Sequence, residues 1–510
     1  MNDSKQVESL WHLVRRTGMS DLLKGLNLLS YFFILKALEE RSFQLGLRDT
    51  IFLGQEAAAC HWNVIKELAR VDGEHCARHL RDNVGPWLRS LDPGSCLDDA
   101  SPVFAQLLPQ LIARIMAEID ILCEGSRAPR EAFEAIERYA EREGAFQPRA
   151  GQIMTPPHIA SLMADLLRPQ PGEKSLDMSC GTGNLLVASY QSLQRFLDTT
   201  PHLLADGRYR GPVPFPPDPP LIGVDYNPQM IPPCYAHLLL CGIERPQIRC
   251  SDALSRSFYR HMTETAPDQV DIILANPPFG GYLDGPDLSE PLQKVGTVDT
   301  ELLFVELALL LLRKEGRAAF LLPEGMLRNP SRAASALRRK LLQENQVNAV
   351  IAFPAGMFLP QASVKTSLVM MTRGGQTRKE ILFYEVREDG FVLDHQRREK
   401  PGQTDLWDVR FLYAAHAGQS APVPGVFSQD DWNQYTSTAA SQYVLPRIEE
   451  RGAEAIVAGF DCTEAWEEHA WFVAPEDIAP PAYSLCASTY RPAPVADHFP
   501  LKTRARGKRA

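Results

Sequence analysis

The stretch DIILANPPFGG, residues 271–281, joins an apolar run to residues that could do chemistry. A side-chain amide, two prolines, a phenylalanine and two glycines follow the run. Prolines restrict the backbone and hold the neighbouring carbonyls in place at little entropic cost. An isolated Asn-Pro-Pro is also compatible with a turn, but Asn-Pro-Pro-Phe directly after a predicted buried strand is more specific. We interpret this strand end as an active site with four catalytic residues, Asn276, Pro277, Pro278 and Phe279.

The chemistry that this stretch supports is the activation of a weakly nucleophilic amine. The exocyclic amine of a nucleobase is a poor nucleophile because its lone pair is delocalised into the ring. Two fixed acceptors, the Asn276 side-chain oxygen and the Pro277 carbonyl, would draw its nitrogen toward tetrahedral geometry and stabilise the positive charge that develops there. Phe279 offers a flat surface on which the base could stack, worth about 1–3 kcal/mol.

A second candidate site lies upstream, in KSLDMSCGTGNLLVAS. This pattern predicts a strand that ends at Asp177, a loop that contains Gly181 and Gly183, and a helix that begins near Asn184. Glycines let the backbone approach a ligand and adopt positive φ, and a helix N-terminus offers free N–H groups to an anion. A G-x-G after a strand is also compatible with a tight turn that binds nothing.

Three further stretches contain candidate residues that also have simpler explanations. Asp225, in PLIGVDYNP, ends a predicted strand where doubly wound folds bind ribose hydroxyls. A proline-rich stretch, residues 206–220, lengthens the usual interval of about 20 residues after the glycines. Asp252, in RCSDALS, could accept from a nucleobase amine. Either acid is also explained as a cap or turn residue. In AGQIMTPPHIA, we expect Thr155 as a helix N-cap and Pro156 as the first helical residue, and ordinary capping explains both.

The elements that must position these residues change in type near residue 150. Residues 1–145 carry apolar residues at helical spacing and predict an all-helical domain. In residues 146–400, short apolar runs alternate with helical patterns, which predicts an α/β domain with a parallel sheet. The predicted strands are KSLDM, PLIGVDY, VDIILA, GRAAFLL, NAVIAF and KTSLVMM. A hairpin is expected around REDG, and residues 401–510 form a mixed C-terminal extension.

Composition restricts the class of protein. A chain of 510 residues is too long for one core. No apolar run reaches the roughly 18 residues of a membrane span, and MNDSKQVESL has no apolar signal core, so we expect a cytoplasmic protein. The ten cysteines are scattered without a C-x-x-C pair, which disfavours a zinc site and a disulfide framework.

A net charge of −10 argues against a protein that binds nucleic acid by itself. Any binding to DNA must therefore use a local basic surface or be shared with a partner. Two basic runs are candidates for a local contact, residues 328–340 and residues 502–510. A solvated helix face and a disordered chain end are the simpler explanations of these runs.

In this order, the motifs resemble those of the N6-adenine DNA methyltransferases, and more narrowly the modification subunit of type I restriction-modification systems. Members place G-Q-x-x-T-P before a glycine loop, then D-P-x-C-G-T-G, an acidic strand end and N-P-P-F-G. The matching residues here are Gly151, Gln152, Thr155, Pro156, Asp177, Cys180, Gly181, Thr182, Gly183, Asp225 and Asn276 to Gly280. The resemblance extends over most of the chain, from LLSYFFILKALEER to WFVAPEDI.

The resemblance implies a Rossmann-like domain that transfers a methyl group from S-adenosylmethionine to N6 of an adenine flipped out of double-stranded DNA. Asp225 would hold the ribose of the cofactor, and Asp252 would lie near its adenine. The implied cofactor-binding residues are Gln152, Thr155, Pro156, Asp177, Gly181, Thr182, Gly183, Asn184, Asp225 and Asp252. No metal ion and no covalent intermediate are needed.

The resemblance also implies partners. A separate specificity subunit would read the DNA sequence, which suits the acidic net charge, and the helical N-terminus and the C-terminal extension would dock it. A restriction or translocase subunit is a further expected partner, in a restriction-modification or related phage-defence complex.

The sequence departs from the family pattern at five positions. Met178 replaces a usual proline, Ser179 a usual alanine and Asn184 a usual glycine, while Ile153 and Met154 stand where an aromatic is common. These departures motivate a second hypothesis, a DNA-binding scaffold of a defence complex with impaired catalysis. A third hypothesis is a methyltransferase of RNA or of protein glutamine, which would share the Asn-Pro-Pro-Phe loop but not the long helical domain.

Overall fold

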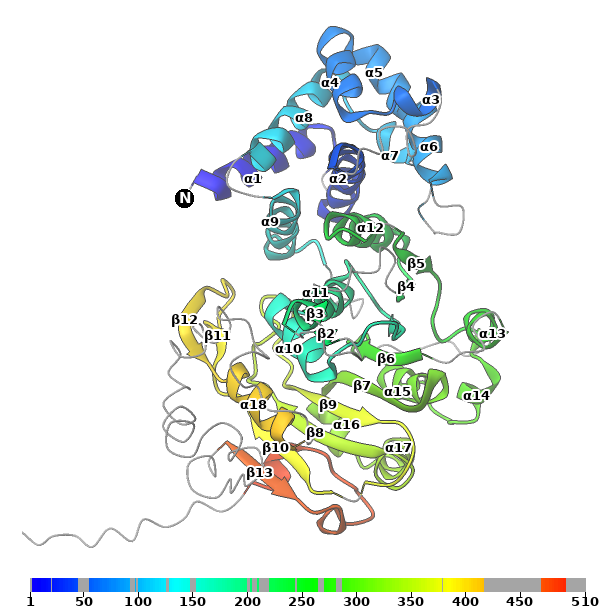
Figure 1. Cartoon of the computed structure of the whole chain (residues 1–510), viewed down its shortest axis with the longest axis vertical. Helices are drawn as coiled ribbons and strands as arrows, with labels where there is room; N and C mark the ends of the chain where they lie inside the picture. The colour runs from blue at the N-terminus through cyan, green and yellow to red at the C-terminus, as the bar shows by residue number, and fades with distance from the viewer. Residues whose placement is uncertain are drawn as a thin grey trace, which may run out of the picture.

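The chain folds into a helical unit above a layered α/β unit (Figure 1). The computed structural model describes residues 2–19, 21–44, 55–91, 97, 100–124, 128–146, 153–199, 202–203, 209–210, 220–243, 245–264, 270–280, 287–377, 379–416 and 469–491.

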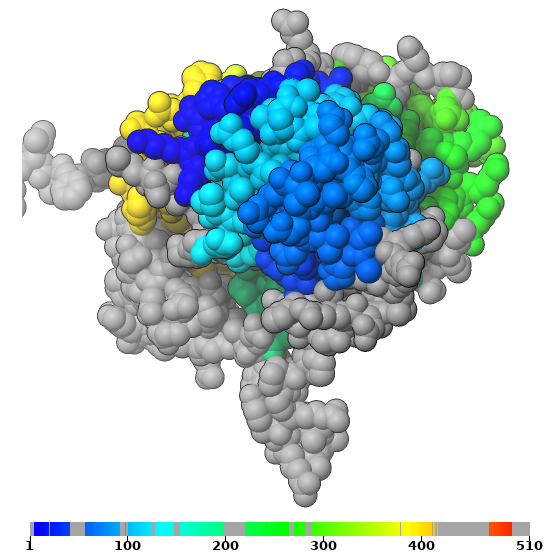
Figure 2. All heavy atoms as spheres, turned by 90° about the horizontal axis from the view of Figure 1, so that it is seen from above, coloured from blue at the N-terminus to red at the C-terminus, as the bar shows by residue number. Residues whose placement is uncertain are grey.

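The helical unit packs around one long helix, α2, most of whose side chains are buried. The rings of Phe32 and Phe33 on this helix contact Trp62 and Phe133 of neighbouring helices. The core of the unit continues into α12 (Ile231–Leu240) of the α/β unit, so the two units share an apolar interface. Figure 2 looks down on the helical unit, whose blue atoms occupy the centre of this face. Its helices are α1 (Asn2–Arg16), α2 (Leu22–Gln44), α3 (Gln55–Ala58), α4 (Trp62–Val71), α5 (Gly73–His79), α6 (Gly85–Ser90), α7 (Ser101–Phe104), α8 (Pro109–Glu124) and α9 (Pro129–Arg142).

A nine-stranded sheet forms the centre of the α/β unit, in the order β13-β10-β8-β9-β7-β6-β1-β4-β5. The strands β4, β1, β6 and β7 lie side by side and parallel, so their carboxyl ends meet at one edge of the sheet. The bounds are β1 (Ser175–Asp177), β4 (Leu221–Asp225), β5 (Gln247–Cys250), β6 (Val270–Ala275), β7 (Leu312–Pro323), β8 (Gln346–Ala352), β9 (Thr366–Thr372), β10 (Ile381–Glu385) and β13 (Ala470–Val473).

Helices cover both faces of this sheet because its central strands are apolar on both sides. On β6, Ile273 belongs to one core, whereas Ile272 and Leu274 belong to the core of the opposite face. One face carries α13 (Arg256–Glu264), α14 (Glu290–Gln293), α15 (Thr300–Leu311), α16 (Glu324–Arg328) and α17 (Arg332–Gln343). The other carries α10 (Pro157–Leu167), α18 (Leu406–His416) and part of α11 (Asn184–Thr199). Strands with two buried faces are typical of sheets between helical layers.

The predicted α/β fold class with a helical N-terminal region is confirmed, and all six predicted strands form. Two strands at the sheet edges were missed, β5 and β13. Both are short, and β5 (QIRC) is only partly buried, so neither carries the long apolar run of a central strand. The domain boundaries at residues 145 and 400 remain predictions.

The prediction of a wholly parallel sheet was wrong, because β9 runs antiparallel to both β7 and β8. The segment between β8 and β9 contains turns but no helix. A parallel return needs a crossover, usually through a helix, so the chain instead turns back and inserts β9 between its two neighbours. The edge strand β13 is likewise antiparallel to β10.

The predicted hairpin around REDG was also wrong in its position. Strand β10 pairs with β8 and β13, whereas β11 (Asp389–Phe391) pairs with β12 (Glu399–Thr404). Asp389, within REDG, is buried, forms an ion pair with Arg397, and lies 3.5 Å from Nε2 of His158. These contacts hold Asp389 at the start of a strand and move the turn to the residues between β11 and β12. A further small pair joins β2 (His202–Leu203) to β3 (Tyr209–Arg210).

The basic run at residues 328–340 does not form a uniformly solvated surface. Arg328, Arg332 and Arg339 are exposed, but Lys340 pairs with Glu306. Arg338 is fully buried and donates to the carbonyls of Met326, Asn329, Ala482 and Tyr483. Arg338 therefore ties α17 to the C-terminal extension. The second run, residues 502–510, lies outside the described residues.

We predict that Arg338→Ala lowers the free energy of unfolding by about 3 kcal/mol or more, because it leaves buried carbonyls without a donor. The matched control is Arg339→Ala, whose side chain is exposed on the same helix and should change stability by less than about 0.5 kcal/mol. Urea denaturation followed by circular dichroism measures both. Equal effects of the two substitutions would contradict this role of Arg338.

Candidate active site

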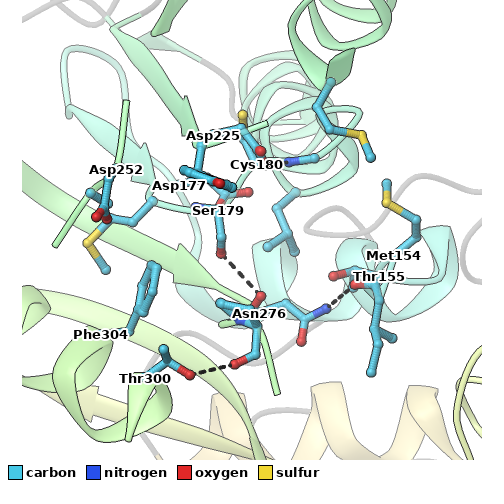
Figure 3. Close-up of a pocket in the computed structure, with 18 of the residues that line it drawn as sticks. Met154, Thr155, Asp177, Ser179, Cys180, Asp225, Asp252, Asn276, Thr300 and Phe304 are labelled. Carbon is cyan, nitrogen blue, oxygen red and sulfur yellow. Dashed lines mark hydrogen bonds between the residues drawn. The ribbon is translucent and has the colours of Figure 1, made fainter. Parts of the chain in front are cut away.

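A pocket of about 330 Å³ opens where the carboxyl ends of β1, β4, β5 and β6 meet (Figure 3). Strand β1 lies at the point from which later strands extend to either side, with β4 and β5 on one side and β6 and β7 on the other. Open α/β sheets bind ligands at such a switch point, beyond the carboxyl ends of the strands. The sheet topology therefore brings together loops that are far apart in the sequence.

Eight of the predicted site residues line this pocket, while five do not. The lining residues are Thr155, Asp177, Gly181, Asn184, Asp225, Asp252, Asn276 and Pro278. Those outside its wall are Pro156, Thr182, Gly183, Pro277 and Phe279. Gln152 lies outside the described residues. The two motifs that the sequence separates by about a hundred residues thus face one cavity.

The orientation of the Asn276 amide is determined by its partner. The Nδ2 atom donates to the Ile153 carbonyl oxygen at 2.8 Å, and a carbonyl can only accept. The amide oxygen Oδ1 therefore points the other way, is buried, and has no hydrogen-bond partner. A buried acceptor without a donor costs about 1–3 kcal/mol, and the residue that carries it is one of those that line the pocket (Figure 3).

The rest of the Asn-Pro-Pro-Phe loop is held by contacts from three sides. Ser179 Oγ donates to the Asn276 carbonyl at 3.1 Å, and Thr300 Oγ1 donates to the Pro278 carbonyl at 3.0 Å. The Phe279 ring is half-buried and meets the Phe358 ring edge-on, with centroids 5.9 Å apart. These contacts fix the backbone of the loop at the end of β6.

The glycine loop, Gly181 to Gly183, needs its glycines for different reasons. Both glycines have positive φ. In addition, a Cβ on Gly181 would lie 3.1 Å from Cε of Met154, at the pocket wall. A Cβ on Gly183 would lie 3.0 Å from Sγ of Cys234, behind the loop. Thr182 is fully buried and is not among the residues that line the pocket. Only part of the loop is therefore available to a ligand.

Two carboxyl groups at the pocket have raised pKa values, one on the buried Asp177 and one on the half-buried Asp225. The pKa of Asp177 is raised to about 8, mainly by burial and also by the nearby charge of Asp225. A hydrogen bond from the Ser179 N–H acts in the opposite direction and lowers this pKa. The Oδ2 atom of Asp177 has no partner. Burial also raises the pKa of Asp225, although its two oxygens accept from the N–H groups of Gly181 and Asn227, each at 2.8 Å. A cation in this pocket would relieve both carboxyl groups.

Asp252 fits both interpretations considered from the sequence. Its Oδ1 atom accepts from the Leu254 N–H at 2.9 Å, as a turn residue does. Its side chain also lines the pocket at the end near Phe304 (Figure 3).

The predicted cap of the next helix was wrong by one residue. Helix α10 begins at Pro157, and its N-cap is Pro156, which makes no side-chain cap hydrogen bond. A residue before a proline is excluded from the helical region, and Pro156 accordingly has ψ 138°. Thr155 is therefore released from capping and lies buried in the pocket wall.

The residues that depart from the family pattern make specific contacts. The Ser179 hydroxyl reaches the Asn276 carbonyl, and Asn184 Nδ2 donates to the Thr155 carbonyl at 3.0 Å. Met178 is buried in a sheet core, and Met154 packs over Gly181. These residues join the walls of the pocket rather than filling it.

Sequence reasoning missed several lining residues, most of them apolar. Ser251, Ala253 and Leu254 flank a predicted residue, so adjacency was the available signal. Thr300 and Phe304 are four residues apart at the start of a helix that follows the Asn-Pro-Pro-Phe loop, and this spacing places them on one face. The lining residues that were not predicted as site residues are Ile153, Met154, Met178, Ser179, Cys180, Leu185, Tyr226, Met230, Ser251, Ala253, Leu254, Thr300 and Phe304.

Two searches of the described residues were negative. No group of three or more His, Cys, Asp or Glu side chains could together hold a metal ion. No helix in the described ranges is both long and apolar enough to cross a membrane.

The sheet, its helical layers and a pocket at the switch point define a Rossmann-like α/β protein with a ligand site. Residues 131–415 match the family model described as N-6 DNA Methylase. Because this match covers more than half of the 510-residue chain, the chain belongs to the N-6 DNA methylase family.

Similar proteins are found both by sequence and by structure. The type I restriction enzyme EcoEI methylase subunit of Escherichia coli is 25% identical over 402 residues, which cover 76% of this chain and 78% of that protein. A chain from a solved type I R-M system superposes with a TM-score of 0.62 at 19% identity, covering 98% of this chain and 92% of that one. A type I restriction-modification methyltransferase subunit from Streptococcus thermophilus gives 0.58 at 16% identity, covering 96% and 100%. These structures share the fold.

We predict that Asp177→Asn becomes increasingly more stable than the wild type as pH rises from about 5 to about 8. Because the folded pKa lies above the ordinary value, the stability of the wild type falls over this range, by about 1 kcal/mol per pH unit. The asparagine variant carries no such titration. Urea denaturation at several pH values, without added ligand, measures the difference, and a difference independent of pH would contradict the buried neutral carboxyl.

Proposed function

We propose that this chain is a site-specific adenine methyltransferase of DNA and the modification subunit of a type I restriction-modification system. The observation that carries the proposal is the buried, unpartnered Asn276 oxygen at the wall of the pocket. It lies in the motif of a family whose chemistry needs an acceptor for the N–H bonds of an amine.

The pocket fits S-adenosylmethionine as methyl donor. The cofactor supplies an activated methyl group on a cationic sulfur. The acidic side chains at the carboxyl ends of β1 and β4, Asp177 and Asp225, would face a cation, and Asp177 has a free oxygen for it. Asp225 accepts one N–H at each oxygen, and each oxygen keeps a second lone pair for a ribose hydroxyl. Asp252 and Phe304, at the same end of the pocket, would hold the cofactor's adenine.

The chain's own contribution to the reaction is to aim the amine of a flipped adenine. The Asn276 oxygen and the Pro277 carbonyl would accept its two N–H bonds and turn its lone pair toward the methyl group. Both acceptors would stabilise the positive charge that develops on nitrogen. The half-buried Phe279 ring would stack on the base, and the hydrogen bonds from Ser179 and Thr300 would keep the loop from shifting.

The scaffold hypothesis loses its motivation in the structure. It rested on the departures from the family pattern, and those residues support the pocket wall. The hypothesis of an RNA or protein-glutamine substrate is not favoured by relatives that are named as type I restriction enzyme methylase subunits.

We further propose partners for the acidic chain. A specificity subunit would supply most of the grip on double-stranded DNA, and a restriction or translocase subunit would complete the complex in the cytoplasm. The helical unit and the C-terminal extension would dock these partners.

We predict that Asn276→Ala lowers kcat for DNA methylation by about 100-fold or more, the size of effect seen when one preorganised charge-stabilising group is lost. The assay uses the full chain assembled with a co-expressed specificity subunit and tritiated S-adenosylmethionine. Isothermal titration calorimetry with S-adenosylmethionine is the control, and the variant should bind as the wild type does.

Three outcomes would overturn this proposal. Wild-type rates in Asn276→Ala would remove the amide from the mechanism. Absence of cofactor binding by the wild-type complex would restore the scaffold hypothesis. Incorporation of label into RNA or protein but not DNA would identify a different substrate.

We also predict that cofactor binding near neutral pH releases a proton. The pKa of Asp177 is about 8, so the carboxyl is mostly neutral at pH 7, and a cation beside it favours ionisation. Affinity should therefore rise as pH increases toward about 8. Calorimetric titrations in phosphate and in Tris, which differ in ionisation enthalpy, measure the released proton. Asp177→Asn should abolish the release, and an identical heat in both buffers for the wild type would contradict the prediction.

A further inference from the structure

Three consecutive residues ahead of α10 are each held by a side chain from a different element. Asn276 Nδ2 donates to the Ile153 carbonyl at 2.8 Å, and Asn184 Nδ2 donates to the Thr155 carbonyl at 3.0 Å. Between them, the Met154 N–H donates to Gln361 Oε1 at 2.6 Å. The segment 153–155 therefore connects the glycine-loop helix to the Asn-Pro-Pro-Phe loop.

Gln361 lies in the turns between β8 and β9 and is buried. Because its Oε1 accepts from a backbone N–H, its Nε2 must point away, and this atom donates to Glu141 of α9. Both ends of the side-chain amide are thus used, one on the helical unit and one on the pocket wall.

The turn that carries Gln361 also supports the aromatic residue of the catalytic loop. The Gln361 N–H donates to the Phe358 carbonyl at 2.8 Å, and the Phe358 ring meets the Phe279 ring edge-on at 76°. One short turn therefore contacts the Asn-Pro-Pro-Phe loop directly, through Phe279, and indirectly, through Met154 and Ile153.

We propose that Gln361 is a positioning residue for methyl transfer: by holding the Met154 N–H it fixes the Ile153 carbonyl, which keeps Asn276 Nδ2 bonded there and leaves the Asn276 oxygen as the acceptor for the amine. Without the hydrogen bond from the Met154 N–H to Gln361, the Asn276 amide can rotate and turn its NH₂ group toward the substrate amine. Two donor groups would then face each other, and no hydrogen bond could form. This inference rests on the proposed function, because the amine is its substrate. Gln361 itself lies outside the pocket wall and touches no reacting atom.

The test compares Gln361→Met, which has a similar volume but cannot accept or donate these bonds, with Asn345→Leu as matched control. Asn345 is another buried amide that bridges two backbone groups, donating to the Lys340 carbonyl and accepting from the Gly374 N–H. It lies at the amino end of β8, away from the pocket residues. Both variants lose the same kind of structural support.

The assay measures kcat for DNA methylation by the assembled complex and Kd for S-adenosylmethionine. We expect Gln361→Met to lower kcat about ten-fold or more while Kd changes less than about three-fold, and Asn345→Leu to keep both near wild type. If the two variants have equal kcat, or if Gln361→Met weakens Kd in proportion to kcat, the positioning role is overturned.

A second pair of variants decides the matter if Gln361→Met does not fold. Glu141→Gln keeps an acceptor for Gln361 Nε2 and should retain kcat within about two-fold, whereas Glu141→Ala removes the acceptor and should lower kcat several-fold. Equal rates for these two variants would overturn the proposal. A wild-type complex that binds cofactor but methylates no DNA would instead refute the proposed function, and the positioning role with it.

Discussion

The hydrogen bond between Asn276 Nδ2 and the Ile153 carbonyl is the interaction on which the site depends. A side-chain amide has a donor end and an acceptor end, and the two ends lead to opposite chemistry toward an amine. Because a carbonyl accepts only, this bond turns the donor end toward Ile153 and leaves the acceptor end without a partner. The protein bears the cost of a buried acceptor without a donor, which a substrate amine would relieve.

The same principle applies to the carboxyl groups of the pocket. Asp177 is held in a position where its ionised form is disfavoured, and the neighbouring Asp225 adds to the cost. Such groups are expensive in a purely structural role and useful where a cation binds. Carboxyl groups with raised pKa values thus suit the cationic cofactor that we propose, and the acidic net charge agrees with the proposed partners for DNA binding.

The helical unit contacts residues that hold the walls of the pocket in place. On α9, Glu134 pairs with His237, whose Nδ1 lies 3.3 Å from the Thr182 carbonyl behind the glycine loop. Burial alone would lower the pKa of His237, but the contact with the Glu134 carboxylate, which accepts from the ring, and the charge of Glu137 raise that pKa above its ordinary value. One turn after Glu137 on the same helix, Glu141 accepts a hydrogen bond from Gln361. Helix α9 therefore contacts both sides of the site.

Local sequence determined the strands, the glycine loop, the Asn-Pro-Pro-Phe loop and the resemblance to a family, because each depends on residues close together along the chain. The resemblance to a family also implied that Asp177, Asp225 and Asn276 belong to one site. Only the tertiary structure decided that β9 runs antiparallel, that Thr182 and Gly183 do not line the pocket, and that Gln361 reaches Met154. The physical reason is that strand direction, side-chain burial and hydrogen-bond partners depend on neighbours that lie far apart in the sequence, and no local pattern records them.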